Sequence, residues 1–254
     1  MKGFLVLTEA RSGSNWLGSI TNNTGQMGRS GEWLDCLNSD IRPSDYSPSE
    51  FFNLVIDKGR SGNDRFGVRV FPWHLHWVQH QCGFDFVAEC LKRHETKLLL
   101  LYREDRMRQA ISYARGVMTS QWTSRIAKKG PEVYNFKDIC RAYFHIERSF
   151  AFWRAYLTMH GHSYAEFAYE DLLSDPTPYI RTLADQLEVE TPTELRTDLK
   201  IQRDELTEKW IRQFRTDLAS HNVMESAGLP KLPSRTPANL LRFLRKETMT
   251  PLPY

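Results

Sequence analysis

The sequence predicts an α/β fold in which helices flank a mostly parallel sheet. Four short apolar runs, at 4–7, 66–70, 97–102 and 164–168, are typical of strands that are buried on both faces. Helical patterns lie between and after these runs, and such alternation favours a parallel sheet over an antiparallel one. A chain of 254 residues is long enough to bury a sizeable core of this kind.

The helices are predicted from apolar spacing and from start signals. In the clearest case, apolar residues from Ile139 to Leu157 recur at alternating steps of four and three, which gives one core-facing stripe. Ser174 and Asp175 before Pro176 are typical of a helix start. The predicted helices are 84–94, 106–118, 137–160, one that begins near Pro176, and 204–219.

Two segments lack this periodicity. Residues 34–65 are polar and rich in Ser, Asp and Pro, so we expect a long loop or lid there. The last segment, 222–254, is rich in proline around a short basic helix at 239–246. Without internal repeats, we expect 1–254 to form one domain with a loop at about 28–65 and a Pro-rich tail.

Composition excludes several classes of protein. Lys and Arg total 34 and Asp and Glu total 31, and the net charge of +3 is too small for a typical nucleic-acid binder. Without a run of about 18 apolar residues, we expect no membrane span, and the start of the chain lacks the pattern of a signal peptide. The four cysteines form no CxxC pair, so we expect reduced thiols in a cytoplasmic protein.

The turn after the first apolar run has the composition of an anion site. Gly13 permits close backbone approach, Ser12 and Ser14 add hydroxyl donors, and Arg11 adds a fixed positive charge. A helix that follows such a turn presents unpaired N–H groups and its positive dipole end to an anion. The Walker A lysine is absent, so we expect no metal-assisted phosphate site. An ordinary turn with an N-cap serine stays open as the alternative.

A second cationic strand end follows the run 97–102. Arg103 comes directly after this run, and Ser112 lies nine residues further on in a predicted helix. Because ligands bind at the carboxyl ends of parallel strands, Arg11 and Arg103 are expected to face one doubly anionic ligand. The alternative is that Arg103 pairs with Glu104 or Asp105. We interpret the basic run 103–115 as a solvated helix face.

The sequence disfavours a zinc site. Its candidate ligands have the spacing H-x-H-x₃-H-x-C, but tryptophans interleave with them and no second cluster completes a site. We therefore expect no metal. The candidate ligands are His74, His76, His80 and Cys82.

These motifs resemble those of sulfotransferases that use 3′-phosphoadenosine 5′-phosphosulfate (PAPS). The turn Arg11-Ser12-Gly13-Ser14 resembles the family's 5′-phosphosulfate loop, and the pair Arg103 and Ser112 is similar to its 3′-phosphate motif. Tyr169-Glu170-Asp171-Leu172, followed by Asp175-Pro176, resembles a later structural motif of the superfamily.

The resemblance is strongest to bacterial carbohydrate sulfotransferases of the trehalose and lipopolysaccharide type, and it runs from about residue 3 to 218. These have an arginine in the first loop and a glutamate 21 residues later, as Arg11 and Glu32 stand here. The strand at 66–70 resembles their G-x-K/R strand, and 202–215 their C-terminal helix motif. The chain departs from the pattern at Ala10 and over 33–62, which bears on the acceptor more than on the donor.

The resemblance implies a sulfotransferase fold with a P-loop-like sheet. It further implies transfer of a sulfuryl group from PAPS to a hydroxyl of a carbohydrate or glycolipid, without a metal, and it is compatible with a homodimer. The implied donor-binding residues are Arg11, Ser12, Gly13, Ser14, Asn15, Trp16, Arg103 and Ser112.

On this resemblance Glu32 is the candidate general base, and Arg11 stabilises the leaving phosphate. Glu32 is expected to lie beside Arg11 and to stay ionised. Arg29, Trp33 and the loop at 34–65 would shape the acceptor pocket. Trp33 would either stack on a sugar ring or lie in the core, and Arg69 would either face the sulfuryl group or pair with an acid.

Two functions from other classes stay open. A metal-dependent P-loop kinase lacks support, because the Gly-Lys-Ser/Thr motif and an acidic Mg²⁺ ligand are missing. A non-catalytic nucleotide-binding module would keep the same fold, and substitution of Glu32 would distinguish it from an enzyme.

Overall fold

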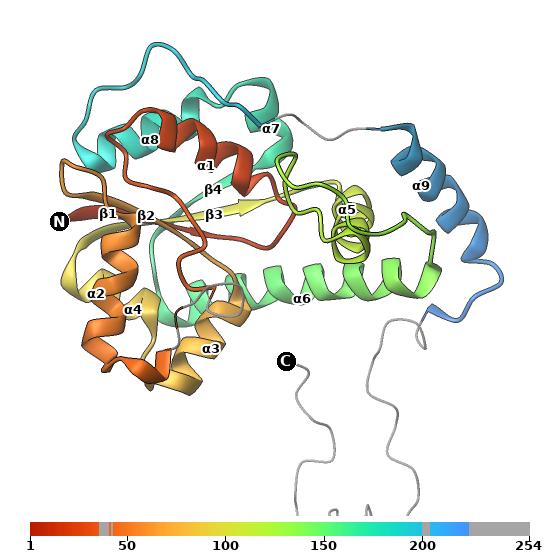
Figure 1. The fold of residues 1–254 in the computed structure, drawn as a ribbon, viewed down its shortest axis with the longest axis horizontal. Coiled ribbons are helices and arrows are strands. Elements are labelled where there is room, and N and C mark those ends of the chain that lie inside the picture. Colours follow the sequence, from red (N-terminus) through yellow and green to blue (C-terminus); the bar gives the residue numbers. More distant parts are fainter. Residues whose placement is uncertain (36–40, 42, 200–203, 224–254) are drawn as a thin grey trace, which may run out of the picture.

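The fold is built on a parallel sheet, as predicted. The computed structural model describes residues 1–35, 41, 43–199 and 204–223. Within them, one four-stranded sheet has the order β2-β1-β3-β4, and every neighbouring pair is parallel (Figure 1). The strands are β1 (Lys2–Leu7), β2 (Arg65–Val70), β3 (Glu95–Tyr102) and β4 (Tyr164–Ala168).

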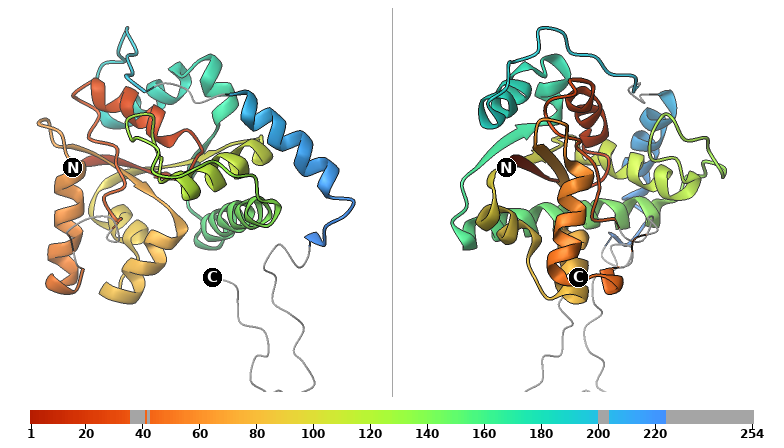
Figure 2. Two further views of the ribbon diagram at one scale, coloured as in Figure 1. Left: turned by 45° about the vertical axis from the view of Figure 1, so that its right-hand side comes forward. Right: turned by 60° about the vertical axis from the view of Figure 1, so that its left-hand side comes forward.

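Helices cover both faces of this sheet, which explains why its strands are apolar throughout. In β1, Phe4 and Val6 point to one face and Leu5 and Leu7 to the other, and all four are essentially fully buried. The first face packs against α1 (Ser14–Asn23), α7 (Tyr169–Ser174) and α8 (Thr177–Leu187) (Figures 1 and 2). On the second face lie α2 (Pro48–Gly59), α3 (Pro72–Cys82), α4 (Phe86–Arg93), α5 (Arg106–Thr119) and α6 (Phe136–His160).

The remaining helix, α9 (Glu205–Asp217), packs against α5 at the edge of the molecule (Figure 2). Its apolar residues Trp210, Ile211 and Phe214 are buried against the core, as its amphipathic pattern predicts. The four predicted strands, and the predicted helices at 84–94, 106–118, 137–160 and 204–219, agree with the observed bounds to within a few residues. The predicted basic helix at 239–246 lies outside the described residues.

The prediction of one long loop over 34–65 is wrong for residues 48–59. A short 3₁₀ helix (Pro43–Asp45) is followed by α2, which buries Phe51, Phe52, Val55 and Ile56. Ser47 is its N-cap: its hydroxyl accepts the Glu50 N–H at 3.3 Å, and Glu50 accepts the Ser47 N–H at 2.8 Å. This capping box, with proline at the first helical position, is a strong start signal that the polar composition concealed.

Strand order places a crevice at the carboxyl end of β1. The chain runs from β1 to β2 on one side and then crosses to β3 on the other, so β1 and β3 diverge at a topological switch point. Ligands of open α/β sheets bind at such points. Arg11 follows β1 and Arg103 follows β3, so both lie at this crevice.

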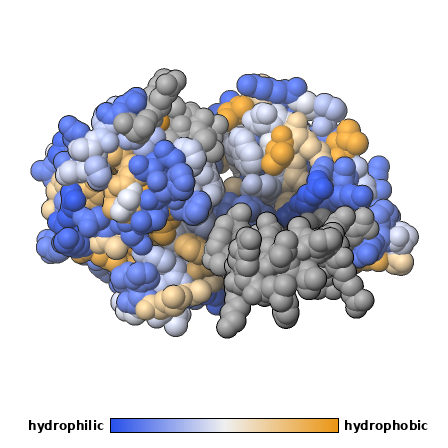
Figure 3. Space-filling view, turned by 90° about the horizontal axis from the view of Figure 1, so that it is seen from below, coloured by the Kyte–Doolittle hydropathy of each residue, from blue (hydrophilic) through white to orange (hydrophobic). Residues whose placement is uncertain are grey.

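None of the helices in the described ranges combines the length and the apolar character that crossing a bilayer requires. Seen from below, the described surface is largely hydrophilic, with separate small apolar patches (Figure 3).

Candidate functional site

The turn between β1 and α1 leaves the N-terminus of α1 open. Gly13 is the N-cap residue with φ 88°, and no side chain accepts a hydrogen bond from the first turn of the helix. A Cβ at Gly13 would lie 2.2 Å from the ring of Tyr169, so only glycine fits there. The alternative of an N-cap serine is therefore wrong, and the backbone N–H groups at the start of α1 lack a side-chain cap.

Hydrogen bonds fix the rest of this turn. The hydroxyl of Ser12, which is fully buried, lies 2.6 Å from that of Thr8, and Thr8 donates to the Leu101 carbonyl at 2.7 Å. Gln109 donates to the Ala10 carbonyl at 2.9 Å. The serine hydroxyl predicted to meet an anion is thus engaged with Thr8, and its observed role is to tie the turn to β3.

Arg11 joins the two predicted anion sites. It has φ 66°, an uncommon conformation for a residue with a side chain. Its Nε donates to Ser112 Oγ at 2.8 Å, and its Nη1 donates to the Trp122 carbonyl at 2.5 Å. Burial and the nearby charges of Arg103 and Arg115 lower the pKa of Arg11 to about 10, so it stays charged at neutral pH.

Arg103 is held by residues of the superfamily-like motif at 169–172. Its Nε lies 3.4 Å from Glu170 Oε1, its guanidinium lies over the Tyr169 ring, and its Nη1 reaches the Arg11 carbonyl at 3.5 Å. Glu170 also accepts the Glu104 N–H at 2.8 Å. The alternative weighed for Arg103, an ion pair with Glu104 or Asp105, is not found among the described residues, because Glu170 supplies the carboxylate instead.

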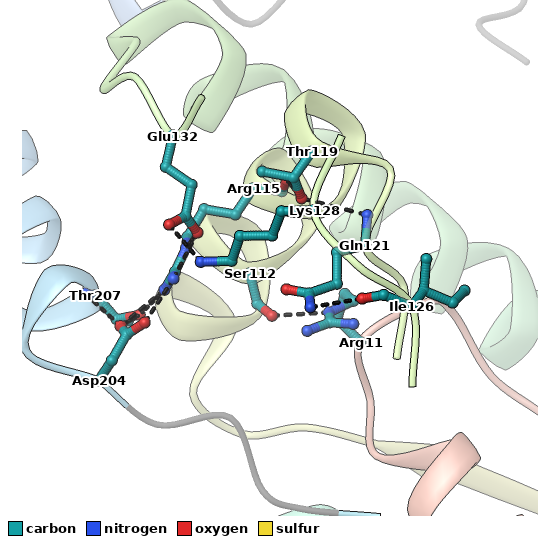
Figure 4. Close-up of polar contacts among 10 residues, drawn as sticks. All are labelled: Arg11, Ser112, Arg115, Thr119, Gln121, Ile126, Lys128, Glu132, Asp204 and Thr207. Atoms are coloured by element: carbon teal, nitrogen blue, oxygen red, sulfur yellow. Dashed lines mark hydrogen bonds and ion pairs between the residues drawn. The ribbon is translucent and has the colours of Figure 1, made fainter. Parts of the chain in front are cut away.

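Arg11, Arg103 and Ser112 line one pocket of about 300 Å³. The described residues around it include five basic side chains and two carboxylates, which leaves an excess of three positive charges. In the close-up, Arg11 meets Ser112, and Arg115 and Lys128 both reach Glu132 (Figure 4). The charged residues of the pocket are Arg11, Arg103, Arg108, Arg115, Lys128, Glu132 and Asp204.

Two basic residues of this pocket belong to the run 103–115, for which the sequence predicts a solvated helix face. This prediction is wrong for Arg108 and Arg115, which line the pocket with Ser112. The signal was available, because positions 108, 112 and 115 are spaced four and three apart and share one helix face.

Arg115 forms hydrogen bonds to two segments that are distant from it in the sequence and that line the pocket. It donates to Glu132 Oε1 at 2.7 Å, to Asp204 Oδ1 at 2.8 Å and to Thr207 Oγ1 at 2.7 Å (Figure 4). Asp204 is also the N-cap of α9 and accepts the Thr207 N–H at 3.0 Å. These contacts join the segment after α5 and the start of α9 to the pocket wall, which sequence spacing alone could not reveal.

Glu32 lies on the β2 side of the crevice, with Arg69 and Asn15. Arg69 Nη1 donates to Asn15 Oδ1 at 2.6 Å and lies 3.5 Å from Glu32 Oε1. Burial raises the pKa of Glu32 above its ordinary value, and the Arg69 charge offsets part of this effect. The expectation of Arg11 as the neighbouring cation is corrected, because the cation within ion-pair distance is Arg69. Of the two roles weighed for Arg69, the pairing with an acid is observed.

The predicted acceptor residues Arg29 and Trp33 are tied to the surrounding backbone. The exposed Arg29 donates through Nε to the Arg60 carbonyl at 2.9 Å. Trp33 is half-buried, donates through Nε1 to the Arg29 carbonyl at 2.7 Å and packs against the core. A Cβ at Gly31 would lie 2.4 Å from its ring, so the Trp33 ring lies directly against the backbone at Gly31. Their contact with an acceptor stays a prediction.

The histidines that suggested zinc lie on different faces of α3. His74 is fully buried, accepts the Phe71 N–H through Nδ1 at 3.2 Å, and burial lowers its pKa to about 3. His76 and His80 are exposed. In the part of the chain that the structure describes, no three potential ligand side chains gather in one place.

Comparison with known proteins assigns the chain to a family. No curated protein matches the sequence. The family model described as Stf0 sulphotransferase matches residues 3–217, which include β1 to β4, the crevice and α9. The match covers most of the chain, and the chain therefore belongs to the Stf0 sulphotransferase family.

Proposed function

We propose that the protein transfers a sulfuryl group from PAPS to a hydroxyl of a carbohydrate or glycolipid acceptor. The observation that carries this proposal is the excess of positive charge at the carboxyl ends of β1 and β3, beside an uncapped helix N-terminus. PAPS has anionic groups at two ends. The helix N-terminus suits the 5′-phosphosulfate, and the cationic pocket suits the 3′-phosphate.

The 5′-phosphosulfate would lie at the start of α1. The backbone N–H groups from Ser14 to Trp16 have no side-chain cap, and the dipole of a ten-residue helix favours an anion there. Arg11 adds a charge at the boundary with the pocket. These donors require no metal ion, which fits the missing P-loop lysine.

The 3′-phosphate would lie in the pocket with Arg103 and Ser112. Arg103 is largely buried and lies within reach of the Arg11 carbonyl, so the two cations are held close together by the fold. Two like charges at this separation favour a ligand with a doubly charged phosphate. This explains how the site would prefer a 3′-phosphorylated nucleotide over ADP or ATP.

The reaction would be an in-line displacement at sulfur. The acceptor oxygen forms the new bond to sulfur, the bond from sulfur to the 5′-phosphate oxygen breaks, and 3′,5′-ADP leaves. The leaving phosphate gains charge, and fixed donors such as Arg11 and the α1 N–H groups would stabilise it. Loss of one such donor costs roughly 10²–10³ in rate.

The acceptor hydroxyl proton would pass to Glu32. Its carboxyl lies on the β2 side of the crevice, where Arg69 connects it to Asn15 in the first turn of α1. A proton acceptor with a raised pKa is better matched to neutral pH than an ordinary carboxylate. Arg29 and Trp33 border Glu32 in the sequence and would contact the rest of the acceptor.

Calorimetric titration with 3′,5′-ADP, in the absence of metal, tests the donor site directly. We expect 3′,5′-ADP to bind much more tightly than 5′-ADP or ATP, because only it has a phosphate for Arg103 and Ser112. Equal or tighter binding of ATP with Mg²⁺, or no binding of 3′,5′-ADP, would contradict the proposal.

A further inference from the structure

A buried carboxylate lies in the turn before Arg11, outside the site described above. Glu9 is only 1% exposed. Its Oε1 accepts the Ala10 N–H at 2.8 Å, and its Oε2 accepts the hydroxyl proton of Ser149, from α6, at 2.7 Å. A buried carboxylate is costly unless hydrogen bonds compensate for its lost hydration, so these contacts hold Glu9 in one orientation.

The second neighbour of Glu9 is a histidine. His145, also on α6, places Nε2 3.4 Å from Glu9 Oε2. This Nε2 is buried and has no hydrogen bond within the described ranges, so the carboxylate is the polar group that faces it. The His145 side chain as a whole is 37% exposed. The ring thus turns one nitrogen inward to a carboxylate, while more than a third of the side chain is exposed.

A row of aromatic rings connects this pair to the pocket. The Tyr113 ring lies 5.3 Å from the His145 ring and 5.6 Å from the Trp122 ring. Trp122, about a third exposed, gives its carbonyl to Arg11, and its ring faces Gly116 in the pocket wall. Burial and the charge of Glu9 raise the pKa of Tyr113 to about 12, so Tyr113 keeps its hydroxyl proton.

The same pair is electrostatically connected to Glu32. After burial and the opposing effect of Arg69, the charges of Asp35 and Glu9 also raise the pKa of Glu32. Glu9 is therefore close enough to act on the proposed proton acceptor. The pair thus borders the cationic pocket through Tyr113 and Trp122, and the charge of Glu9 acts on Glu32.

We propose that His145, oriented by Glu9, is a binding residue for an acceptor hydroxyl at the end of a ring-lined subsite formed with Tyr113 and Trp122. In a neutral imidazole with Nε2–H directed at a carboxylate, Nδ1 is left as a hydrogen-bond acceptor. Aromatic faces beside such an acceptor suit a polyhydroxylated molecule with a flat apolar face, such as a sugar ring. This inference rests on the proposed function and adds recognition residues to it.

Nuclear magnetic resonance of the imidazole nitrogens tests this role in the full chain. The signals of His145 are assigned by comparison with the His145→Phe variant. The protein is first saturated with 3′,5′-ADP, and glucose, galactose and trehalose are then added in turn as probes. We expect at least one sugar to shift the His145 Nδ1 signal, and we expect Glu9→Gln to weaken that response.

A kinetic comparison follows for the probe that is sulfated fastest. His145→Phe keeps a flat ring but removes the acceptor, and the loss of one hydrogen bond should raise KM for the sugar about threefold to tenfold. His145→Gln, which retains an acceptor, should restore part of this loss. His160→Phe, at the exposed end of the same helix, is the matched control and should leave KM unchanged.

The outcomes separate this inference from the proposed function. Failure to bind 3′,5′-ADP overturns the proposed function itself. If 3′,5′-ADP binds but no sugar shifts the His145 signal, the subsite is overturned and the donor site stands. Equal KM values for His145→Phe and His160→Phe would likewise overturn the subsite.

Discussion

The two sides of the crevice at the end of β1 differ in charge. On the β3 side, five basic side chains outnumber two carboxylates around one pocket. On the β2 side, Arg69 lies beside Glu32 at 3.5 Å, and the buried carboxylate of Glu9 is held by hydrogen bonds. The pocket lining on the β3 side is thus cationic, although Arg103 and Arg108 also pair with carboxylates just outside it, whereas the charged groups named on the β2 side are one arginine and two carboxylates.

This difference suits two different ligands. A cationic lining attracts a polyanion, and burial strengthens that attraction because water screens it less. A side with carboxylates suits a neutral hydroxyl compound, which needs hydrogen-bond partners and a proton acceptor. The comparison thus predicts that substitutions on the β3 side change donor affinity, while those on the β2 side change turnover.

The largest effect is expected for Glu32→Gln. The amide keeps the shape of the side chain but cannot take a proton from the acceptor, so kcat should fall about 10²–10⁴-fold. Binding of 3′,5′-ADP, measured by calorimetry, should change little. The exposed Glu190→Gln is the control. Unchanged turnover in Glu32→Gln would favour a binding module or another proton acceptor.

The pH profile sharpens the same test. Glu32 accepts a proton only when ionised, so activity should fall as the pH falls through its pKa. Burial raises that pKa, so the acid limb should lie above the ordinary glutamate range near pH 4.3. Glu32→Gln should remove this limb from whatever activity remains. A limb that persists unchanged would assign it to a different group.

A smaller, complementary effect is expected on the β3 side. Arg103→Met removes a charged donor from the proposed 3′-phosphate site, and the affinity for 3′,5′-ADP should fall about tenfold to a hundredfold. Affinity for 5′-ADP should change much less, because it lacks the phosphate that Arg103 would contact. Titration calorimetry with both nucleotides measures the difference.

Two further variants of this side serve as controls. Arg103→Lys keeps the charge and should recover part of the affinity, although a lysine lacks the planar fork of donors. Arg148→Met removes an exposed arginine from α6 and should have no effect. If Arg103→Met and Arg148→Met bound 3′,5′-ADP equally well, the assignment of donor binding to the β3 side would be wrong.

The β3 side was also the easier side to predict. Apolar runs identify the strands, parallel strands share their carboxyl ends, and Arg11 and Arg103 each follow such a run. Local sequence therefore predicts that Arg11 and Arg103 lie at the carboxyl edge of the sheet. It does not show that Glu170 and Glu132 approach from distant segments, because those contacts depend on tertiary packing.

The β2 side was harder to predict for a different reason. Ser, Pro and Glu at 47–50 are polar, and composition alone suggested a loop, whereas their order encodes a helix start. The partner of Glu32 was also misassigned. Arg11 precedes it on the chain, but a parallel bridge between Gly31 and Val68 of β2 brings Arg69 beside it instead.

The smallest predicted effect tests whether donor binding on the β3 side is independent of the stability of the β2 side. Ser47→Ala removes the hydroxyl that accepts the Glu50 N–H at the start of α2, and the free energy of unfolding should fall by about 1 kcal/mol. Ser49→Ala, in the same helical turn, lacks this capping role and should cost less. Chemical denaturation measures both variants. Because α2 packs behind β2 and not behind the cationic pocket, 3′,5′-ADP affinity should be the same in both, and a parallel loss of affinity would show that the donor side depends on the acceptor side.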